Sequence, residues 1–228
     1  MKDSGPLLGV DTCGVVGSIA LGRFADGRID LLGETQIAGG ELSVSLVQGI
    51  ADLLTAAGVG GSDLAGIVAV AGPGSFTGIR VGLAAVKGLA EAAGLPVVTV
   101  SRLALLAELG RASCSVLDAH RGQFYCGIYG EGAAAREMLL TAGEINAMGG
   151  LTSSTSSSGG RVAVCEETVA QALEELCGEP ELVRVAAPSA SGALRLAVGR
   201  WLAGDFADVG TLDGYYLRGA DAKTAARV

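Results

Sequence analysis

The chain has 228 residues, half of them apolar, and a formal net charge of -8 at pH 7. A chain of this length and composition can bury a substantial core, either as one large domain or as two small ones. The acidic balance disfavours unaided binding of nucleic acid, because that affinity comes largely from lysine and arginine side chains that neutralise phosphates. We therefore expect any contact with RNA to depend on another subunit.

The amino terminus and the histidine and cysteine content favour a cytoplasmic protein without a metal or other cofactor. No segment approaches the ~18 consecutive apolar residues of a membrane-spanning helix, and the start, MKDSGPLLGVDTC, lacks the hydrophobic stretch of a secretory signal. The single histidine, His120, cannot build a multi-histidine zinc site, and no two cysteines form a C-x-x-C pair. We expect small core roles for the five cysteines, Cys13, Cys114, Cys126, Cys165 and Cys177.

Apolar patterns in the first half of the chain alternate between strands and helices. Short apolar runs bounded by glycine and proline predict strands, and leucine and isoleucine at helical spacing predict the first long helix. The expected elements are strands at 7–11, 17–24 and from Arg28, a helix at 42–57, a strand at 66–72, a helix at 77–93 and a strand at 96–100. This order favours an α/β fold with mixed sheets covered by helices.

The same pattern then begins again. Residues 115–145 repeat the strand, turn, strand, turn, strand order of the start, and Asp118 stands where Asp11 stands in the first copy. Such a repeat predicts two duplicated lobes. We expect an amino-terminal lobe over 1–110 that carries the two long helices and a carboxyl-terminal lobe over 111–228, whose last helix packs back on the first lobe.

The second half contains one low-complexity segment. Residues 151–160, LTSSTSSSGG, are too polar and too rich in glycine to pack, so we expect a flexible surface loop. Beyond it the pattern predicts short strands at RVAVC and ELVRV and helices at about 166–176 and 191–203, the latter capped by Ser189 or Ser191.

The motif AGPGSFTGIRVG at 71–82 looks at first like a phosphate-binding turn. A Walker loop requires lysine at the start of the helix, where this chain has Thr77, Gly78 and Ile79, and its glycine spacing does not fit the dinucleotide fingerprint. An anion site on the amides of the helix start stays open. The other reading is a tight turn from strand to helix.

Each long helix has a second face beside its core face, made of small residues on the second helix and of apolar residues on the first. Within 77–93 the apolar core face is separate from a stripe of small residues that contains Gly78 and Gly82, and glycine inside a helix costs about 1 kcal/mol relative to alanine. Something must therefore approach this backbone closely, either the chain's own sheet or the helix of another subunit. The first helix adds an apolar stripe beside its core face, formed by Val44, Val47 and Ala51.

Four segments resemble one protein family. AGPGSFTGIRVGLAAVKGLA is similar to the signature of the TsaB (YeaZ) family, the non-catalytic subunit of the bacterial tRNA threonylcarbamoyladenosine machinery, and LLGVDTCGVVGSIAL, LDAHRGQFYCGIY and YYLR extend the resemblance over most of the chain. The resemblance implies an actin-like ATPase fold made of two ribonuclease-H-like lobes.

The resemblance also implies a scaffold that forms a homodimer when alone and pairs with the catalytic subunit TsaD. It reaches the ATPase subunit TsaE and the tRNA only through that complex. The family pairs through its two long helices, so the expected interface residues are Val44, Val47, Ala51, Gly78, Gly82, Ala85 and Leu89. No catalytic residue is expected.

The first long helix departs from related proteins. TsaD uses a pair of histidines on this helix for its metal site, and many relatives of TsaB keep a His-Ser or His-Thr pair at its start. This chain has Leu42-Ser43 there and no histidine in the helix. Whatever that histidine contributes elsewhere, this chain cannot use it.

Two other functions stay open at this stage. One is an actin-like ATPase or small-molecule kinase that uses Asp11 and the turn at 72–75. The other is a peptidase that acts on a partner, although no serine–histidine pair or metal cluster can be read from the sequence. Asp11 and Asp118 can instead bond the amides of their own turns, as aspartates at strand ends often do.

Overall fold

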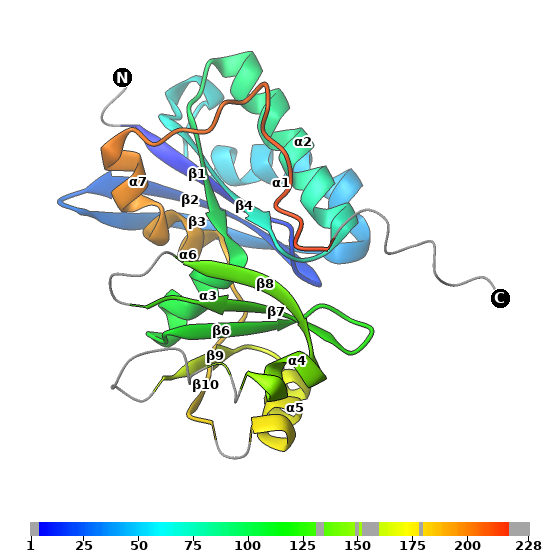
Figure 1. The fold of residues 1–228 in the computed structure, drawn as a ribbon. Helices are drawn as coiled ribbons and strands as arrows, with labels where there is room; N and C mark the ends of the chain where they lie inside the picture. The colour runs from blue at the N-terminus through cyan, green and yellow to red at the C-terminus, as the bar shows by residue number, and fades with distance from the viewer. Residues whose placement is uncertain (1–4, 131–134, 149–150, 152–159, 178–179, 219–228) are drawn as a thin grey trace. The chain divides into compact units, whose positions relative to one another are not determined.

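The computed structural model describes residues 5–130, 135–148, 151, 160–177 and 180–218, and the chain divides into two compact units (Figure 1). Unit 1 consists of Met1–Leu105 and Ala187–Gly214, and unit 2 of Leu106–Ala186 and Tyr215–Val228. Each unit contains one five-stranded mixed sheet.

The sheet of unit 1 has the order β3-β2-β1-β4-β5. The first three strands form an antiparallel meander, and β4 and β5 run parallel to β1. β1 and β4 are buried along their whole length, which explains why their sequences, PLLGVD and GIVAVAG, are almost continuously apolar. The strands are β1 (Pro6–Asp11), β2 (Val16–Ala25), β3 (Arg28–Ala38), β4 (Gly66–Gly72) and β5 (Val97–Ser101).

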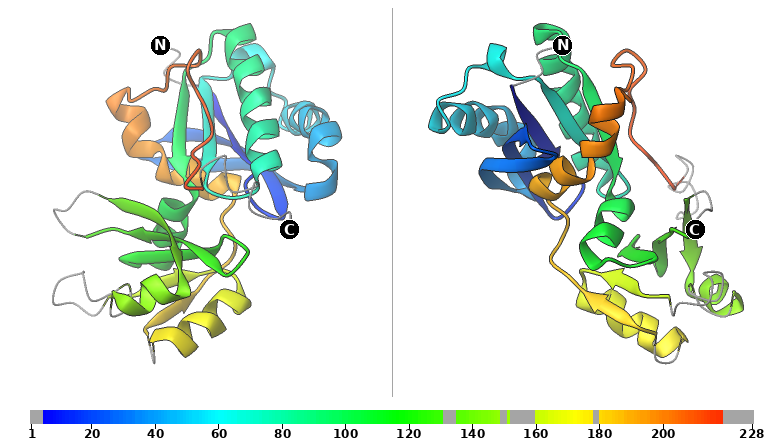
Figure 2. Two further views of the ribbon diagram at one scale, coloured as in Figure 1. Left: turned by 45° about the vertical axis from the view of Figure 1, so that its right-hand side comes forward. Right: turned by 90° about the vertical axis from the view of Figure 1, so that its left-hand side faces the viewer.

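Helices cover both faces of this sheet (Figure 2). On β2, Ile19 lies under α1 (Leu42–Ala56), whereas Ser18 and Gly22 face α6 (Ala190–Leu196), because alternate residues of a strand point to opposite faces. α2 (Phe76–Ala93) packs against β4 on the α1 side. Short 3-10 turns, η1 (Gly39–Glu41) and η2 (Gly61–Asp63), flank α1.

The segment expected as one helix at 191–203 is two helices, and this expectation was wrong. α6 ends at Leu196, Ala197 lies between, and α7 runs from Val198 to Ala203. Ser189 makes no side-chain cap. The cap bonds come from the sheet instead, because the N–H of Ala190 donates to Ser18 Oγ at 2.8 Å and the N–H of Ser191 to Glu34 Oε1 at 3.0 Å.

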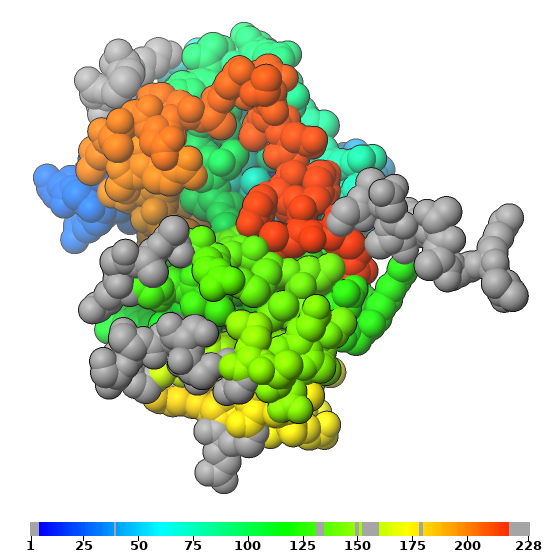
Figure 3. Space-filling view, viewed as in Figure 1, coloured from blue at the N-terminus to red at the C-terminus, as the bar shows by residue number. Residues whose placement is uncertain are grey.

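The chain then crosses unit 1 once more before it enters unit 2. The N–H of Ala207 donates to the carbonyl of Val97 at 2.8 Å, and Lys87 Nζ on α2 donates to the carbonyl of Leu212 at 3.2 Å. Figure 3 shows this carboxyl-terminal segment, coloured orange to red, on the surface. It is an extended strap rather than a further helix or strand.

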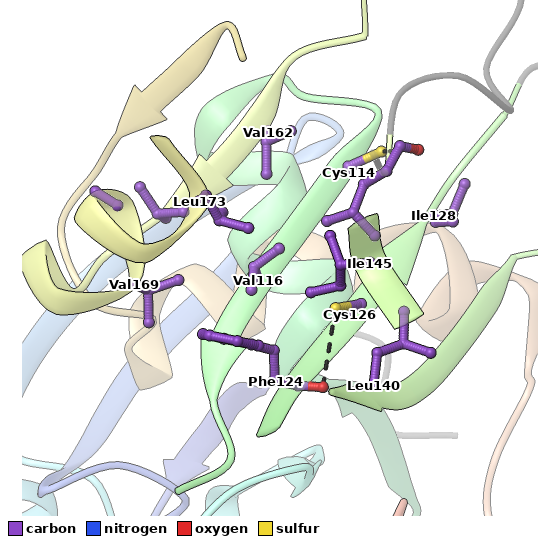
Figure 4. Close-up of a cluster of buried hydrophobic side chains, with 13 residues drawn as sticks. Cys114, Val116, Phe124, Cys126, Ile128, Leu140, Ile145, Val162, Val169 and Leu173 are labelled. Atoms are coloured by element: carbon purple, nitrogen blue, oxygen red, sulfur yellow. Dashed lines mark hydrogen bonds between the residues drawn. The ribbon is translucent and has the colours of Figure 1, made fainter. Parts of the chain in front are cut away.

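Unit 2 repeats the arrangement of unit 1. Its sheet has the order β8-β7-β6-β9-β10, again an antiparallel meander followed by two parallel strands. A cluster of buried side chains that includes Cys114, Cys126, Ile145 and Leu173 forms the core (Figure 4). The elements are β6 (Cys114–Asp118), β7 (Gln123–Ile128), β8 (Arg136–Thr141), α4 (Ala142–Ala147), β9 (Val162–Val164), α5 (Glu167–Cys177) and β10 (Leu182–Arg184).

Two copies of one ribonuclease-H-like sheet order in a single chain confirm the predicted actin-like α/β fold. Two helices were not expected, α4 and α3 (Arg102–Gly110). Leu151, at the start of the expected serine-rich loop, is buried and its carbonyl accepts a bond from the Cys114 thiol at 3.6 Å, so the loop prediction was wrong at that residue. Residues 152–159 of that segment lie outside the described residues.

Candidate functional site

The first strand of unit 1 ends in a buried aspartate that braces its own turn. Asp11 is only 2% exposed, and its Oδ1 accepts the N–H of Cys13 at 2.9 Å. Burial raises the pKa of the Asp11 carboxyl, while the positive charge of Arg102 acts to lower it. The side chain therefore has a structural role in the turn, which is one of the two roles that the sequence left open for Asp11.

The turn after β1 packs against the glycine motif at 71–82. Thr12 Oγ1 donates to the carbonyl of Gly78 at 2.8 Å, and the Cys13 carbonyl accepts the N–H of Ser75 at 2.8 Å. A Cβ added to Gly78 or Gly82 would collide with Thr12. The close approach that the two glycines require is thus made by Thr12 of the same chain, which corrects the expectation that a partner helix makes it.

At the start of α2, the capping residue Ser75 accepts hydrogen bonds from backbone amides of the helix. Ser75 Oγ accepts the N–H of Gly78 at 3.2 Å, and the Ser75 carbonyl accepts the N–H of Ile79 at 2.9 Å. The Gly78 amide would otherwise be free to bind an anion at the helix start, whereas the Ile79 bond is the first regular bond of the helix. The glycine and proline residues before the helix therefore form the tight turn from strand to helix that was the other reading of this motif.

The outer surface of α1 and α2 exposes apolar side chains. Val44 is 82% and Val47 61% exposed on α1, and Ala51 on the same helix is also exposed. On the neighbouring α2, Ala85 and Leu89 are half-buried. We call these five residues the α1/α2 face; Figure 1 shows the two helices side by side. Exposed apolar patches of this kind are typical of partner-binding sites.

The start of α1 has an apolar role in place of the histidine. Leu42 is buried, and its side chain packs over Gly17 of β2, where there is no room for a Cβ. Within the described residues no group of three histidine, cysteine, aspartate or glutamate side chains is placed to hold a metal ion. Cys114 and Cys126 are buried in the core of unit 2, and burial raises the pKa of the Cys126 thiol to about 12.

His120 lies at the end of the first strand of unit 2 and not in a cluster of ligands. Its ring Nδ1 is 3.0 Å from Asp118 Oδ2, and the other oxygen of Asp118 accepts the His120 N–H at 2.7 Å. The ring thus bonds an aspartate of its own turn rather than a serine. Among the described helices none is both long and apolar enough to cross a membrane.

Comparison with known families gives a match over most of the chain. The model of the family described as TsaD, tRNA N6-adenosine threonylcarbamoyltransferase, matches residues 36–187, about two thirds of the 228 residues. The chain belongs to the TsaD family. No curated protein matches it.

Two solved structures show where the chain stands relative to that family. YeaZ from Pseudomonas aeruginosa is 26% identical with a TM-score of 0.73, and the match covers 93% of this chain and all of that one. A crystal structure described as an uncharacterized protein with similarity to peptidase YeaZ, from the same organism, is 25% identical with a TM-score of 0.72 and covers 94% of this chain and all of that one. The similarity to YeaZ (TsaB) expected from the sequence is confirmed.

Proposed function

We propose that the chain is a non-catalytic scaffold subunit for the threonylcarbamoyl modification of adenosine in tRNA, and that it pairs with a TsaD-type catalytic subunit. Membership of the TsaD family and similarity to YeaZ over nearly the whole chain support the pathway. The observation that carries the scaffold role is the α1/α2 face, where two valines of one helix are more than half exposed.

The α1/α2 face suits a helix from another subunit. Val44, Val47 and Ala51 lie on one side of α1, so they present a continuous strip about two turns long. Burying two valines fully is worth roughly 1.5–3 kcal/mol each before the costs of association are subtracted. This face would be used in a homodimer when the chain is alone and in the pair with TsaD.

The chemistry in this proposal belongs to the partner. The net charge of -8 argues that tRNA is held mainly by other subunits, with the ATPase subunit TsaE reached through the same complex. The chain contributes by holding the catalytic subunit in a competent arrangement. The rival ATPase or kinase function needs Asp11 free to face a metal-bound phosphate, and it predicts stabilisation of the purified chain by magnesium and ATP, which the scaffold function does not.

Reconstitution tests the proposal. The chain, its cognate TsaD-type subunit, the ATPase subunit, tRNA and threonylcarbamoyl-adenylate are mixed, and modified adenosine is measured by mass spectrometry. Turnover should require the chain, and the chain with tRNA and adenylate alone should modify none. Replacing Val44 and Val47 by aspartate should weaken pairing at least about tenfold and reduce turnover in proportion.

The matched control replaces another exposed apolar residue of unit 1. Leu202 on α7 is 63% exposed and lies outside the α1/α2 face, so Leu202→Asp should leave pairing and turnover unchanged. Since all three positions are exposed, each variant should keep its melting temperature. Equal loss of pairing in Leu202→Asp, or full turnover in the double valine variant, would contradict the proposed interface.

A further inference from the structure

The guanidinium of Arg102 is buried and lacks a carboxylate partner in the described part of the chain. Arg102 begins α3 directly after β5, and the residue is 8% exposed. Its Nε has no hydrogen-bond partner, and the ion pairs formed by the described residues do not include it. A permanently charged group in such a position is costly unless something neutralises it and accepts its hydrogen bonds.

Asp11 does not meet this need. The two charges act on each other through space, but no ion pair within 4.0 Å joins them. The Asp11 carboxylate bonds instead to the N–H of Cys13, within its own turn. Asp11 therefore forms no ion pair with Arg102.

The β1–β2 turn provides a seat for the guanidinium. A Cβ built on Gly14 would lie 2.7 Å from Arg102 Nη2 and 3.5 Å from Cζ, so a larger residue at this position would displace the guanidinium. The next residue, Val15, is 88% exposed, so the turn that contacts the guanidinium lies at the surface of unit 1.

The seat lies at the carboxyl edge of the parallel strands of unit 1. β1 ends at Asp11, β4 at Gly72 and β5 at Ser101, and the Cys13 carbonyl and the Ser75 N–H join the first two edges at 2.8 Å. In α/β sheets, ligands bind outside the carboxyl ends of such strands. The planar fork of arginine matches the paired oxygens of a carboxylate or phosphate.

From these contacts we propose that Arg102, seated on Gly14, binds a small oxyanion, a phosphate or a carboxylate, at the carboxyl edge of the unit 1 sheet. The site is separate from the α1/α2 face and does not depend on the proposed scaffold function. Its ligand completes the hydrogen bonding of a guanidinium that the fold leaves incomplete.

Titration calorimetry of the purified chain with inorganic phosphate, and separately with acetate, tests the proposal, with chloride at matched ionic strength as the reference. The chain should bind at least one of the two anions saturably. Arg102→Met should weaken that binding at least about tenfold, since it removes charged hydrogen bonds, and Arg102→Lys should give a smaller loss. Gly14→Ala, which displaces the guanidinium, should also weaken binding.

Arg28→Met serves as the control, because Arg28 is exposed and paired with Asp30 at the β2–β3 turn. It should bind the anions as the unchanged chain does. If Arg102→Met fails to fold, calorimetry of the unchanged chain still tests the proposal. Binding of phosphate and acetate no greater than that of chloride would overturn it. The proposal would also be overturned if the unchanged chain bound neither anion and Arg102→Met lost pairing with TsaD. Arg102 would then bind a carboxylate of the partner.

Discussion

The turns after β1 and β6 occupy equivalent places in the two sheets but lie in different surroundings. Asp11 and Asp118 each accept the N–H of the residue two positions ahead, at 2.9 and 2.7 Å. Asp11 is 2% exposed, whereas the side chain of Asp118 is 36% exposed. The two copies therefore keep the bond of the aspartate to its turn, and the elements packed on each turn decide its environment.

A different segment packs on each turn. In both units this segment follows the parallel strand next to the turn. After β4, a glycine-rich turn brings the backbone of α2 onto Thr12. After β9, contact is made by a side chain, because Glu166 Oε2 accepts the N–H of Asp118 at 2.9 Å. Backbone packing buries Asp11, Thr12 and Cys13 in the first turn, whereas the second turn, which a single carboxylate contacts, leaves Asp118 partly exposed.

The open turn of unit 2 is held from another direction. His120, Arg121 and Gly122 are all left-handed, with φ of 61°, 58° and 71°, a conformation that costs non-glycine residues energy. Arg218 Nη2 donates to the Ala119 carbonyl and to Gln123 Oε1, each at 2.8 Å. The YYLR segment near the carboxyl end thus supplies in unit 2 the support that α2 supplies in unit 1.

Replacing Gly82 by arginine should have the largest effect on this comparison. The new side chain would have to occupy the space of Thr12, so we expect a loss of roughly 3 kcal/mol or more in the free energy of unfolding. Gly88→Arg on the same helix meets open space and should be stable, as thermal melting can show. Equal melting temperatures for the two variants would mean that Thr12 does not fill the position.

Removing the Thr12 hydroxyl should have the next largest effect. Thr12→Val keeps the shape but leaves the Gly78 carbonyl without its donor, so unfolding should cost about 1–2 kcal/mol less in urea titrations. Thr12→Ser, which keeps the hydroxyl, should lose less. If serine and valine lose the same amount, the hydrogen bond contributes nothing to the docking of α2.

Arg218→Met tests the support of the second turn. Loss of bonds from a half-buried guanidinium should cost about 1 kcal/mol, and hydrogen exchange should accelerate at residues 119–123 while the turn after β1 stays protected. Arg28→Met provides the reference for an exposed arginine. Unchanged exchange at 119–123 would show that the turn holds itself.

The smallest effect concerns the charge of Asp11. Because its pKa is raised on folding, the native state binds more protons, so this carboxyl favours folding below its unfolded pKa near 4 and that contribution is lost as pH rises through the folded value. Asp11→Asn should remove this slope from stability measured against pH. It should also support full turnover in the reconstituted mixture; a folded, pairing variant that abolishes turnover would point to a catalytic aspartate.

The sequence identified most elements because their patterns are local. The apolar runs of β1 and β4 and the helical spacing of α1 and α2 predicted boundaries within a residue or two of those observed. α4 was missed, although Thr141 and Glu144 form a capping box whose spacing was present in the chain. The interface role of the α1/α2 face remains a prediction, since only a partner can test it.

By itself the sequence determined the duplication and the mixed sheets, because the order of strand and helix patterns can be read locally. It also determined that something must approach Gly78 and Gly82 closely, because glycine inside a helix is otherwise unfavourable. Only the tertiary structure decided that Thr12, 66 positions from Gly78, fills that space. It also broke the last helix at Ala197 and seated Arg102 on Gly14. These contacts join residues far apart in the chain, and no local pattern encodes which distant side chain will arrive.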